Sequence, residues 1–208
     1  MRFLQHRILI FTRAPVAGAC KTRLIPALGR RGAARAHRQL ASHSLRMAQG
    51  AALAPVTLCC APDSRHAFFT LARMRTGVRL QRQSGSDLGR RMAGALRQAL
   101  RSCRAAIIIG TDCPLLDAEY LAQACAALEQ HDVVLGPAAD GGYVLVGTCV
   151  HEPRLFAGIR WGGPRVLAAT RRRLRRLRLD WIELQTLWDV DTARDWSRAR
   201  RSLKRRPP

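Results

Sequence analysis

The stretch AAIIIGTDCP, residues 105–114, decides the fold class of this chain. Five apolar residues in a row are typical of a short strand that is buried on both faces of a sheet. The residues that follow, Gly110, Thr111 and Asp112, change at once to small and polar types. In an open α/β sheet, ligands bind in loops at the carboxyl ends of such strands. The stretch therefore predicts a buried strand with a polar site directly behind it.

Strands and helices are predicted to alternate along the whole chain. Compact apolar stretches predict strands at residues 7–12, 55–60, 78–80, 105–109, 132–136, 142–147 and 181–184. Apolar residues at helical spacing predict helices at residues 33–49, 67–74, 88–103, 118–129, 163–179 and 193–203, with Asp87 and Asp117 as caps. This alternation predicts an α/β fold with a mostly parallel sheet and helices on both faces. We expect one domain over residues 1–203, and a basic disordered tail at 204–208.

The charge of the chain first suggests a nucleic-acid-binding protein. The 208 residues carry a formal net charge of +22, with 36 Lys and Arg against 14 Asp and Glu. Only Lys21 and Lys204 are lysines, however, and the other 34 basic residues are arginines. Such a bias is what a GC-rich genome gives without any binding role. Aromatic residues make up only 5% and form no stacking platform for bases, so nucleic-acid binding is the disfavoured alternative.

The cysteines and the apolar segments indicate the cellular compartment in which the protein is expected. The chain has seven cysteines, which is an odd number, and no Cys-x-x-Cys or zinc-spaced cluster. Reduced thiols in a cytoplasmic protein are the simplest account. We expect no signal peptide and no transmembrane helix, because the apolar runs are short or contain proline. Hydrophobic residues at 48% indicate a globular chain.

The loop after the first predicted strand, residues 13–26, suits a phosphate group. Its small residues let the backbone approach a ligand closely, and Lys21 and Arg23 add fixed positive charge. A Walker A loop is excluded, because no glycine directly precedes Lys21 and Pro26 is expected to break the helix that such a lysine opens. A flexible basic loop is the remaining alternative.

Two further loops place carboxylates behind predicted strands. Asp112 suits a divalent metal, which prefers oxygen ligands and links to phosphates; a turn or a helix cap is the alternative. Residues 136–143 include Asp-Gly-Gly, which is typical of a hairpin, or of a glycine-lined floor under a substrate with Asp140 and Tyr143 beside it.

A fourth loop, residues 188–192, carries Asp189 and Asp191 just before the last helix. We expect one of these two acids to face a metal while the other caps the helix, and helix capping alone is the alternative. Four of the 14 acids of this arginine-rich chain thus fall in loops of this kind. This placement predicts a metal–phosphate site.

Six ordered blocks between Ile10 and Trp196 resemble a known family. The blocks are APVAGACKTRLIPALG from Ala14, QSGSDLGRRM from Gln83, GTDCPLL from Gly110, LGPAADGGYVLVG from Leu135, WGGPRVLAAT from Trp161 and DVDTARDW from Asp189. They resemble the GT-A-like transferases known as radical-SAM/selenodomain-associated, or arsenosugar-biosynthesis-type, glycosyltransferases of the nucleotide-diphospho-sugar transferase superfamily. The resemblance extends to small nucleotidyltransferases of the phospholactate guanylyltransferase and molybdenum-cofactor types.

The resemblance implies a Rossmann-like GT-A fold, a Mg²⁺ or Mn²⁺ cofactor, a nucleotide or nucleotide-sugar donor and a small-molecule acceptor. It implies that donor phosphates are bound by Arg13, Gly18, Lys21 and Arg23, and the base and ribose by Gln83, Gly85 and Asp87. It implies metal ligands at Asp112, Asp191 and Asp189, and an acceptor site at Asp140, Gly141, Gly142, Tyr143 and Trp161. Lys21, Arg23 and Asp112 take the catalytic roles.

The chain departs from the family pattern at three positions. Ala17 stands where proline is usual, and Gly163 where threonine is usual. Typical metal-dependent glycosyltransferases have Asp-x-Asp, and here Pro114 takes the place of the second acid. Glycosyl transfer from a nucleotide-sugar is therefore the first hypothesis. Nucleotidyl transfer to a phosphorylated small molecule, with release of pyrophosphate, is the alternative.

Overall fold

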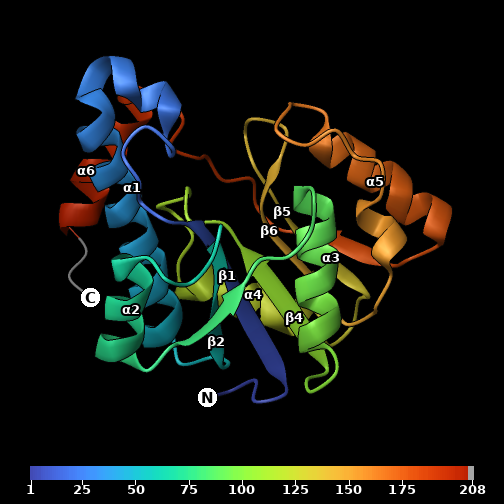
Figure 1. The fold of residues 1–208 in the computed structure, drawn as a ribbon. Coiled ribbons are helices and arrows are strands. Elements are labelled where there is room, and N and C mark those ends of the chain that lie inside the picture. The colour runs from blue at the N-terminus through green and yellow to red at the C-terminus, as the bar shows by residue number, and fades with distance from the viewer. Residues whose placement is uncertain (206–208) are drawn as a thin grey trace.

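A seven-stranded sheet runs through the centre of the structure, a computed structural model that describes residues 1–205 (Figure 1). Its strands are β1 (His6–Arg13), β2 (Val56–Ala61), β3 (Arg79–Arg82), β4 (Ala105–Ile109), β5 (Val133–Pro137), β6 (Tyr143–Thr148) and β7 (Trp181–Glu183), in the order β3-β2-β1-β4-β6-β5-β7. Strand β6 is antiparallel to both of its neighbours, and every other pair is parallel. The predicted mostly parallel sheet is confirmed.

Helices cover both faces of the sheet, as the alternating pattern predicted (Figure 1). They are α1 (Ile25–Gly50), α2 (Ala67–Thr76), α3 (Leu88–Ala99), α4 (Ala118–Ala127), α5 (Val166–Leu177) and α6 (Ala193–Arg205), with short 3₁₀ turns η1 (Thr22–Leu24) and η2 (Pro153–Phe156). Ile8 and Ile10 of β1 pack with α1, α2 and α4, whereas Leu9 packs with α3 and α5. This alternation follows from the two-residue period of a strand, whose side chains point to opposite faces.

Helix α1 begins eight residues earlier than predicted. Pro26 lies in its first turn, where the missing N–H of proline costs no hydrogen bond. The helix is kinked at Gly29, which has φ 68° and ψ 166°. The expectation that Pro26 breaks a helix after Lys21 was therefore wrong, although the missing glycine before Lys21 still separates this loop from a Walker A sequence.

Other helix ends shift for local reasons. Asp87 and Asp117 cap α3 and α4 as predicted, since their carboxylates accept bonds from the backbone N–H groups of Arg90 and Tyr120. Helix α5 begins at Val166 rather than at residue 163, and residues 161–165 form turns before it. Helix α6 runs to Arg205, so it includes the first two residues of the predicted tail. The rest of that tail, residues 206–208, lies outside the described residues.

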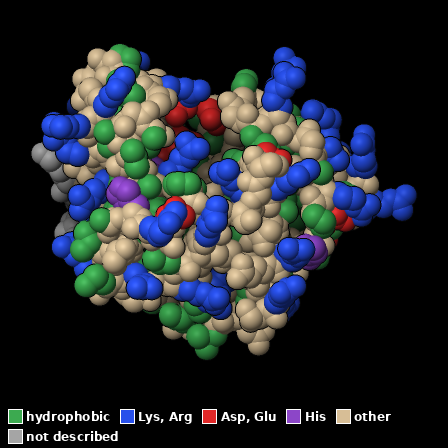
Figure 2. All heavy atoms as spheres, in the orientation of Figure 1, with side chains coloured by type: hydrophobic (Ala, Val, Ile, Leu, Met, Phe, Trp, Pro, Cys, Tyr) green, Lys and Arg blue, Asp and Glu red, His purple; other side chains and the backbone are tan. Residues whose placement is uncertain are grey.

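Three further expectations can be compared with the structure. All seven cysteines are free thiols. Within residues 1–205, no helix combines the length and the apolar character that crossing a membrane requires. Figure 2 shows Lys and Arg side chains spread over the visible face, with acidic side chains in a hollow near its top.

Candidate functional site

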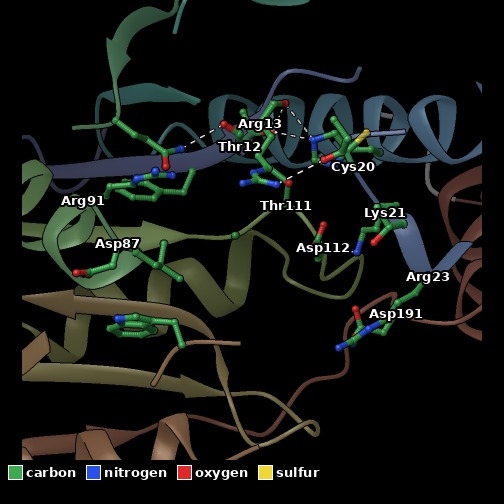
Figure 3. Close-up of a pocket in the computed structure, with 18 of the residues that line it drawn as sticks. Thr12, Arg13, Cys20, Lys21, Arg23, Asp87, Arg91, Thr111, Asp112 and Asp191 are labelled. Carbon is green, nitrogen blue, oxygen red and sulfur yellow. Dashed lines mark hydrogen bonds and ion pairs between the residues drawn. The ribbon is translucent and has the colours of Figure 1, made fainter. Parts of the chain in front are cut away.

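Loops at the carboxyl ends of β1, β3, β4 and β5 enclose a cleft of two connected chambers. Figure 3 shows residues that line the first chamber. The first chamber has a volume of about 770 Å³ and is lined by polar residues that include Thr12, Arg13, Lys21, Arg23, Gln83, Ser86, Asp87, Arg91, Thr111 and Asp112. The second has a volume of about 420 Å³ and is lined in part by Asp140, Gly142, Tyr143, Gly163 and Asp189. Both are lined by Arg23, Leu88, Asp112, Trp161 and Asp191, which form the junction. The four loops singled out in the sequence therefore meet in one cleft.

Two ion pairs stand at the junction. The Lys21 ammonium lies 3.0 Å from Oδ2 of Asp112 and also donates a hydrogen bond to the Val190 carbonyl, so its side chain is only 7% exposed. The Arg23 guanidinium lies 2.8 Å from Oδ2 of Asp191. Lys21 has φ +46°, a left-handed conformation that is uncommon for a lysine and turns the chain into η1. The two cations of the predicted phosphate loop thus contact two of the predicted metal ligands.

Asp112 connects two loops that are far apart in the sequence. Its carbonyl accepts a hydrogen bond of 2.9 Å from the N–H of Val190, and this bond holds the loop after β4 against residues 188–192. Its carboxylate Oδ1 is buried and has no hydrogen-bond partner, and the same is true of Oδ1 of Asp189. Buried carboxylate oxygens without a partner are uncommon and indicate a position that a ligand or ion satisfies.

The expectation that Asp189 or Asp191 caps α6 was wrong. Thr192 caps α6, because its hydroxyl accepts from the N–H of Asp195 and the Asp195 carboxylate accepts from the N–H of Thr192. This reciprocal arrangement is a capping box. Both earlier acids are released from capping and line the second chamber.

Burial, together with the nearby carboxylates of Asp140 and Asp112, raises the pKa of Asp189 to about 7. An acid whose pKa is raised by folding costs stability once it ionises, so this cost grows as the pH rises from about 4 and is complete above about pH 7. Asp189→Asn is expected to increase the free energy of unfolding by about 2 kcal/mol at pH 8, with the gain fading toward pH 4. Urea unfolding at pH 4.5, 6 and 8 with a chelator present measures this. An equal effect at all three pH values would contradict it.

The donor set suits a hard divalent cation, but it is not assembled into a closed cage. Within residues 1–205, no three Asp, Glu, His or Cys side chains are close enough to bind a metal as a group. The cleft nevertheless offers carboxylate oxygens, and Oδ1 of Asp112 and Oδ1 of Asp189 are buried and unpartnered. Oxygen ligands are those that Mg²⁺ and Mn²⁺ prefer. The metal ligands remain a prediction that the chemistry of these residues fits.

The loop after β3 forms the far wall of the first chamber. The Gln83 amide donates to the carbonyls of Thr12 and Cys59, at 3.2 and 2.8 Å, and this fixes its orientation. Gly85 has φ +141°, and a Cβ there would lie 2.8 Å from the N–H of Arg91, so the turn requires glycine. Arg91 donates to the Gly85 carbonyl and lines the chamber.

The loop between β5 and β6 forms the floor of the second chamber. Asp140 Oδ1 accepts a hydrogen bond of 2.8 Å from the N–H of Gly142, which gives a tight turn. The Tyr143 ring meets Trp161 edge-on, with centroids 6.4 Å apart. The Tyr143 hydroxyl is buried, so this residue contributes its ring to the chamber rather than its oxygen.

Gly18, Gly85 and Gly141 shape turns instead of lining the chambers, and all three have positive φ. The tightest is Gly141, where an added Cβ would lie 2.1 Å from the Pro164 carbonyl oxygen. Gly141→Ala is expected to lower the free energy of unfolding by about 2–3 kcal/mol, because backbone must move and φ is +86°. Urea unfolding measures this. Gly163→Ala is the control, since no atom lies within 4 Å of the added Cβ, and an equal loss there would contradict the explanation.

The site residues predicted from the sequence leave out several polar residues of the first chamber, among them Thr12, His37, Arg91 and Thr111. Burial lowers the pKa of His37, whose Nε2 lies 3.0 Å from the Arg13 carbonyl. His37 lies among the core residues of α1, and nothing in its spacing separates it from them. Arg91 lies one helical turn after the cap residue Asp87. This spacing could have predicted that Arg91 faces the same site as Asp87.

Comparisons with known proteins agree with this architecture. A comparison with curated proteins finds no match for this chain. A crystal structure of a Desulfovibrio desulfuricans protein, to which nucleotide-diphospho-sugar transferase activity is ascribed, has 32% identity and a TM-score of 0.82, covering 91% of this chain and 83% of its own.

Two more distant structures share only the fold. The 4-diphosphocytidyl-2C-methyl-D-erythritol synthase of Anaerococcus prevotii is 9% identical with a TM-score of 0.63, covering 98% of this chain and 99% of its own. The Rv0371c protein of Mycobacterium tuberculosis, in complex with manganese, is 16% identical with a TM-score of 0.58, covering 94% and 97%. The predicted Rossmann-like fold of nucleotide-diphospho-sugar transferases and nucleotidyltransferases is thereby confirmed.

Residues 44–163 match the family model described as uncharacterized protein conserved in bacteria (DUF2064). This segment is more than half of the chain, and it includes the Gln83 and Asp112 loops and most of the second-chamber floor. Together with the 32% identity to the Desulfovibrio desulfuricans protein, the match shows that the chain belongs to the DUF2064 family.

Proposed function

We propose that the protein is a metal-dependent transferase that binds a nucleotide-sugar in the first chamber and transfers the glycosyl group to a small acceptor in the second. The observation that carries this proposal is the junction, where Lys21 and Arg23 contact Asp112 and Asp191 between the two chambers. A polyphosphate lying there would meet cations from one side and the carboxylates of a metal site from the other.

The cations of the first chamber suit a diphosphate. Arg13, Lys21, Arg23 and Arg91 all line it, and charge-assisted hydrogen bonds to phosphate are about twice as strong as neutral ones. As the bond to the sugar breaks, negative charge builds on the leaving diphosphate. A fixed donor aimed at such charge contributes about 3–4 kcal/mol to lowering the barrier. Lys21 is held on two sides and needs little reorganisation to act in this way.

Asp112, Asp191 and Asp189 would hold the divalent metal, with Asp112 as the main ligand. When bound, Mg²⁺ or Mn²⁺ would neutralise phosphate charge and help to orient the donor. The chain's own residues supply the rest: Gln83 and Asp87 lie where the base and ribose would fit, and Trp161 separates the two chambers. No nucleophile of the protein is needed, since the acceptor attacks the donor directly.

One observation favours a second candidate, nucleotidyl transfer. Asp112 is followed by Cys113 and Pro114, so the Asp-x-Asp pair of typical glycosyltransferases is missing. In this alternative the acceptor attacks the α-phosphorus of a nucleoside triphosphate and pyrophosphate leaves. An association with radical-SAM or arsenosugar chemistry remains a prediction from the sequence resemblance.

A donor panel distinguishes the two reactions. Nucleotide-sugars and nucleoside triphosphates are first screened with Mn²⁺ by thermal shift, since a ligand of the folded state raises the melting temperature. Donors that bind are then incubated with acceptors, and nucleoside diphosphate and pyrophosphate are measured. Glycosyl transfer releases the diphosphate; nucleotidyl transfer releases pyrophosphate. Binding of no nucleotide would contradict both.

A further inference from the structure

The two chambers differ sharply in charge. The first is lined by four cations and three carboxylates. The second is lined by four carboxylates, Asp112, Asp140, Asp189 and Asp191, and Arg23 supplies its one cation among the described residues. The chain as a whole has 36 Lys and Arg against 14 Asp and Glu, so the second chamber reverses the balance of the rest of the protein.

The single cation of the second chamber is already engaged. Arg23 lies 2.8 Å from Asp191, at the junction with the first chamber. A phosphate group in the second chamber would therefore find no unpaired cation among the lining residues, and it would approach Asp140 and Asp189. Like charges placed together at a binding site repel each other, and such repulsion is one means by which a site rejects a wrong partner.

The remaining walls fit a hydroxyl-bearing molecule. Asp140 uses Oδ1 for the Gly142 N–H, which leaves Oδ2 as an acceptor for a ligand O–H or N–H. Asp189 lines the same chamber but is one of the proposed metal ligands, so Asp140 is the carboxylate left to contact the acceptor. The rings of Trp161 and Tyr143 give an apolar surface against which a carbon skeleton can pack. A carboxylate beside an aromatic wall thus recognises hydroxyl or amino groups together with C–H surface.

A bound donor would add to the repulsion of a phosphorylated acceptor. The donor's phosphates would lie at the junction and add negative charge at the mouth of the second chamber, while any divalent cation there would be shared with them. A second phosphate, carried by the acceptor, would then face the donor phosphates and the carboxylates together. An uncharged or cationic acceptor meets no such repulsion.

We propose that the second chamber selects an acceptor that carries hydroxyl or amino groups and no phosphate. This inference rests on the proposed function, because it takes the second chamber as the acceptor site. It is compatible with glycosyl transfer and also with nucleotidyl transfer to a sugar hydroxyl, and it excludes the phosphorylated acceptor of the original alternative.

Matched pairs of small molecules test the inference. The full chain is loaded with Mg²⁺, which is diamagnetic, and the nucleoside diphosphate that gives the largest thermal shift. Saturation-transfer NMR then measures the binding of glucose, glucosamine and glycerol, each against its own phosphate ester. We expect each unphosphorylated member to bind at least about tenfold more tightly, which corresponds to about 1.4 kcal/mol.

Asp140→Arg tests the role of charge at a single residue. In this variant we expect the phosphate ester of each pair to bind more tightly than the unphosphorylated member. Glu119→Arg is the matched control: it makes the same change of charge on exposed α4, away from the cleft, and should keep the wild-type preference. Tighter binding of the phosphate esters to the wild type, or binding of no panel member to the nucleotide-loaded protein, would overturn the inference. Failure of nucleotides to bind would instead count against the proposed function.

Discussion

Asp112→Asn is expected to lower turnover by about two to three orders of magnitude and to leave the fold intact. The amide keeps the shape of the side chain and can still accept a bond from the Lys21 ammonium, now 3.0 Å from Oδ2. It loses the negative charge that a divalent cation requires, and it can place an amide nitrogen where the unpartnered Oδ1 lies. Removing one well-placed electrostatic group at a reacting centre costs about 3–4 kcal/mol.

Steady-state kinetics and unfolding measurements together check this expectation. The backbone bond between Asp112 and Val190 is unaffected by the substitution, so the melting temperature should stay within a few degrees of the wild type. Nucleotide binding without metal should be retained, whereas the extra thermal shift caused by Mn²⁺ should disappear. Asp63→Asn removes a partly exposed acid that pairs with Arg65 and lines neither chamber, and it serves as the control. Unchanged turnover in Asp112→Asn would remove Asp112 from the metal site.

Much of the fold could be predicted because its strands are short, apolar and separated by amphipathic helices. Both ends of the strand at residues 105–109 were predicted correctly. Because the strand is buried on both faces, all its residues are apolar, and polar residues mark where it ends. The direction of β6 could not be predicted. A strand buried between two neighbours has the same apolar pattern whether it runs parallel or antiparallel, and only the short Asp-Gly-Gly connection from β5 hinted at a reversal.

The site was predictable as a set of loops but not as a set of contacts. All four loops meet because β1, β4, β5 and β7 run in the same direction, so their carboxyl ends lie at one edge of the sheet. The pairing of Lys21 with Asp112 depends on distances across that edge, which no local pattern encodes. The spacing of Thr192 and Asp195, three residues apart, is that of a capping box. From the sequence, Asp189 and Asp191 were instead considered as the residues that could cap the last helix.

Lys21→Met is expected to weaken binding of the nucleotide donor by about a hundredfold and to lower turnover as well. Methionine fills a similar volume, so the buried position stays packed, but the ammonium that contacts Asp112 and the Val190 carbonyl is lost. A donor diphosphate would lose one charge-assisted contact of about 1.5–3 kcal/mol. Isothermal titration with the nucleoside diphosphate, with and without Mn²⁺, measures the loss directly.

The same substitution separates two roles of Lys21. If the ammonium only neutralises Asp112, Lys21→Met should tighten Mn²⁺ binding and leave the affinity for metal-free nucleotide unchanged. If it contacts the donor phosphates, affinity must fall even without metal, and Lys21→Arg should restore part of it. Arg35→Met removes a cation from the exposed side of α1 and controls for the general loss of positive charge, which at a net charge of +22 should have little effect. An unchanged nucleotide affinity in Lys21→Met would place the phosphates elsewhere in the first chamber, against Arg13 and Arg91.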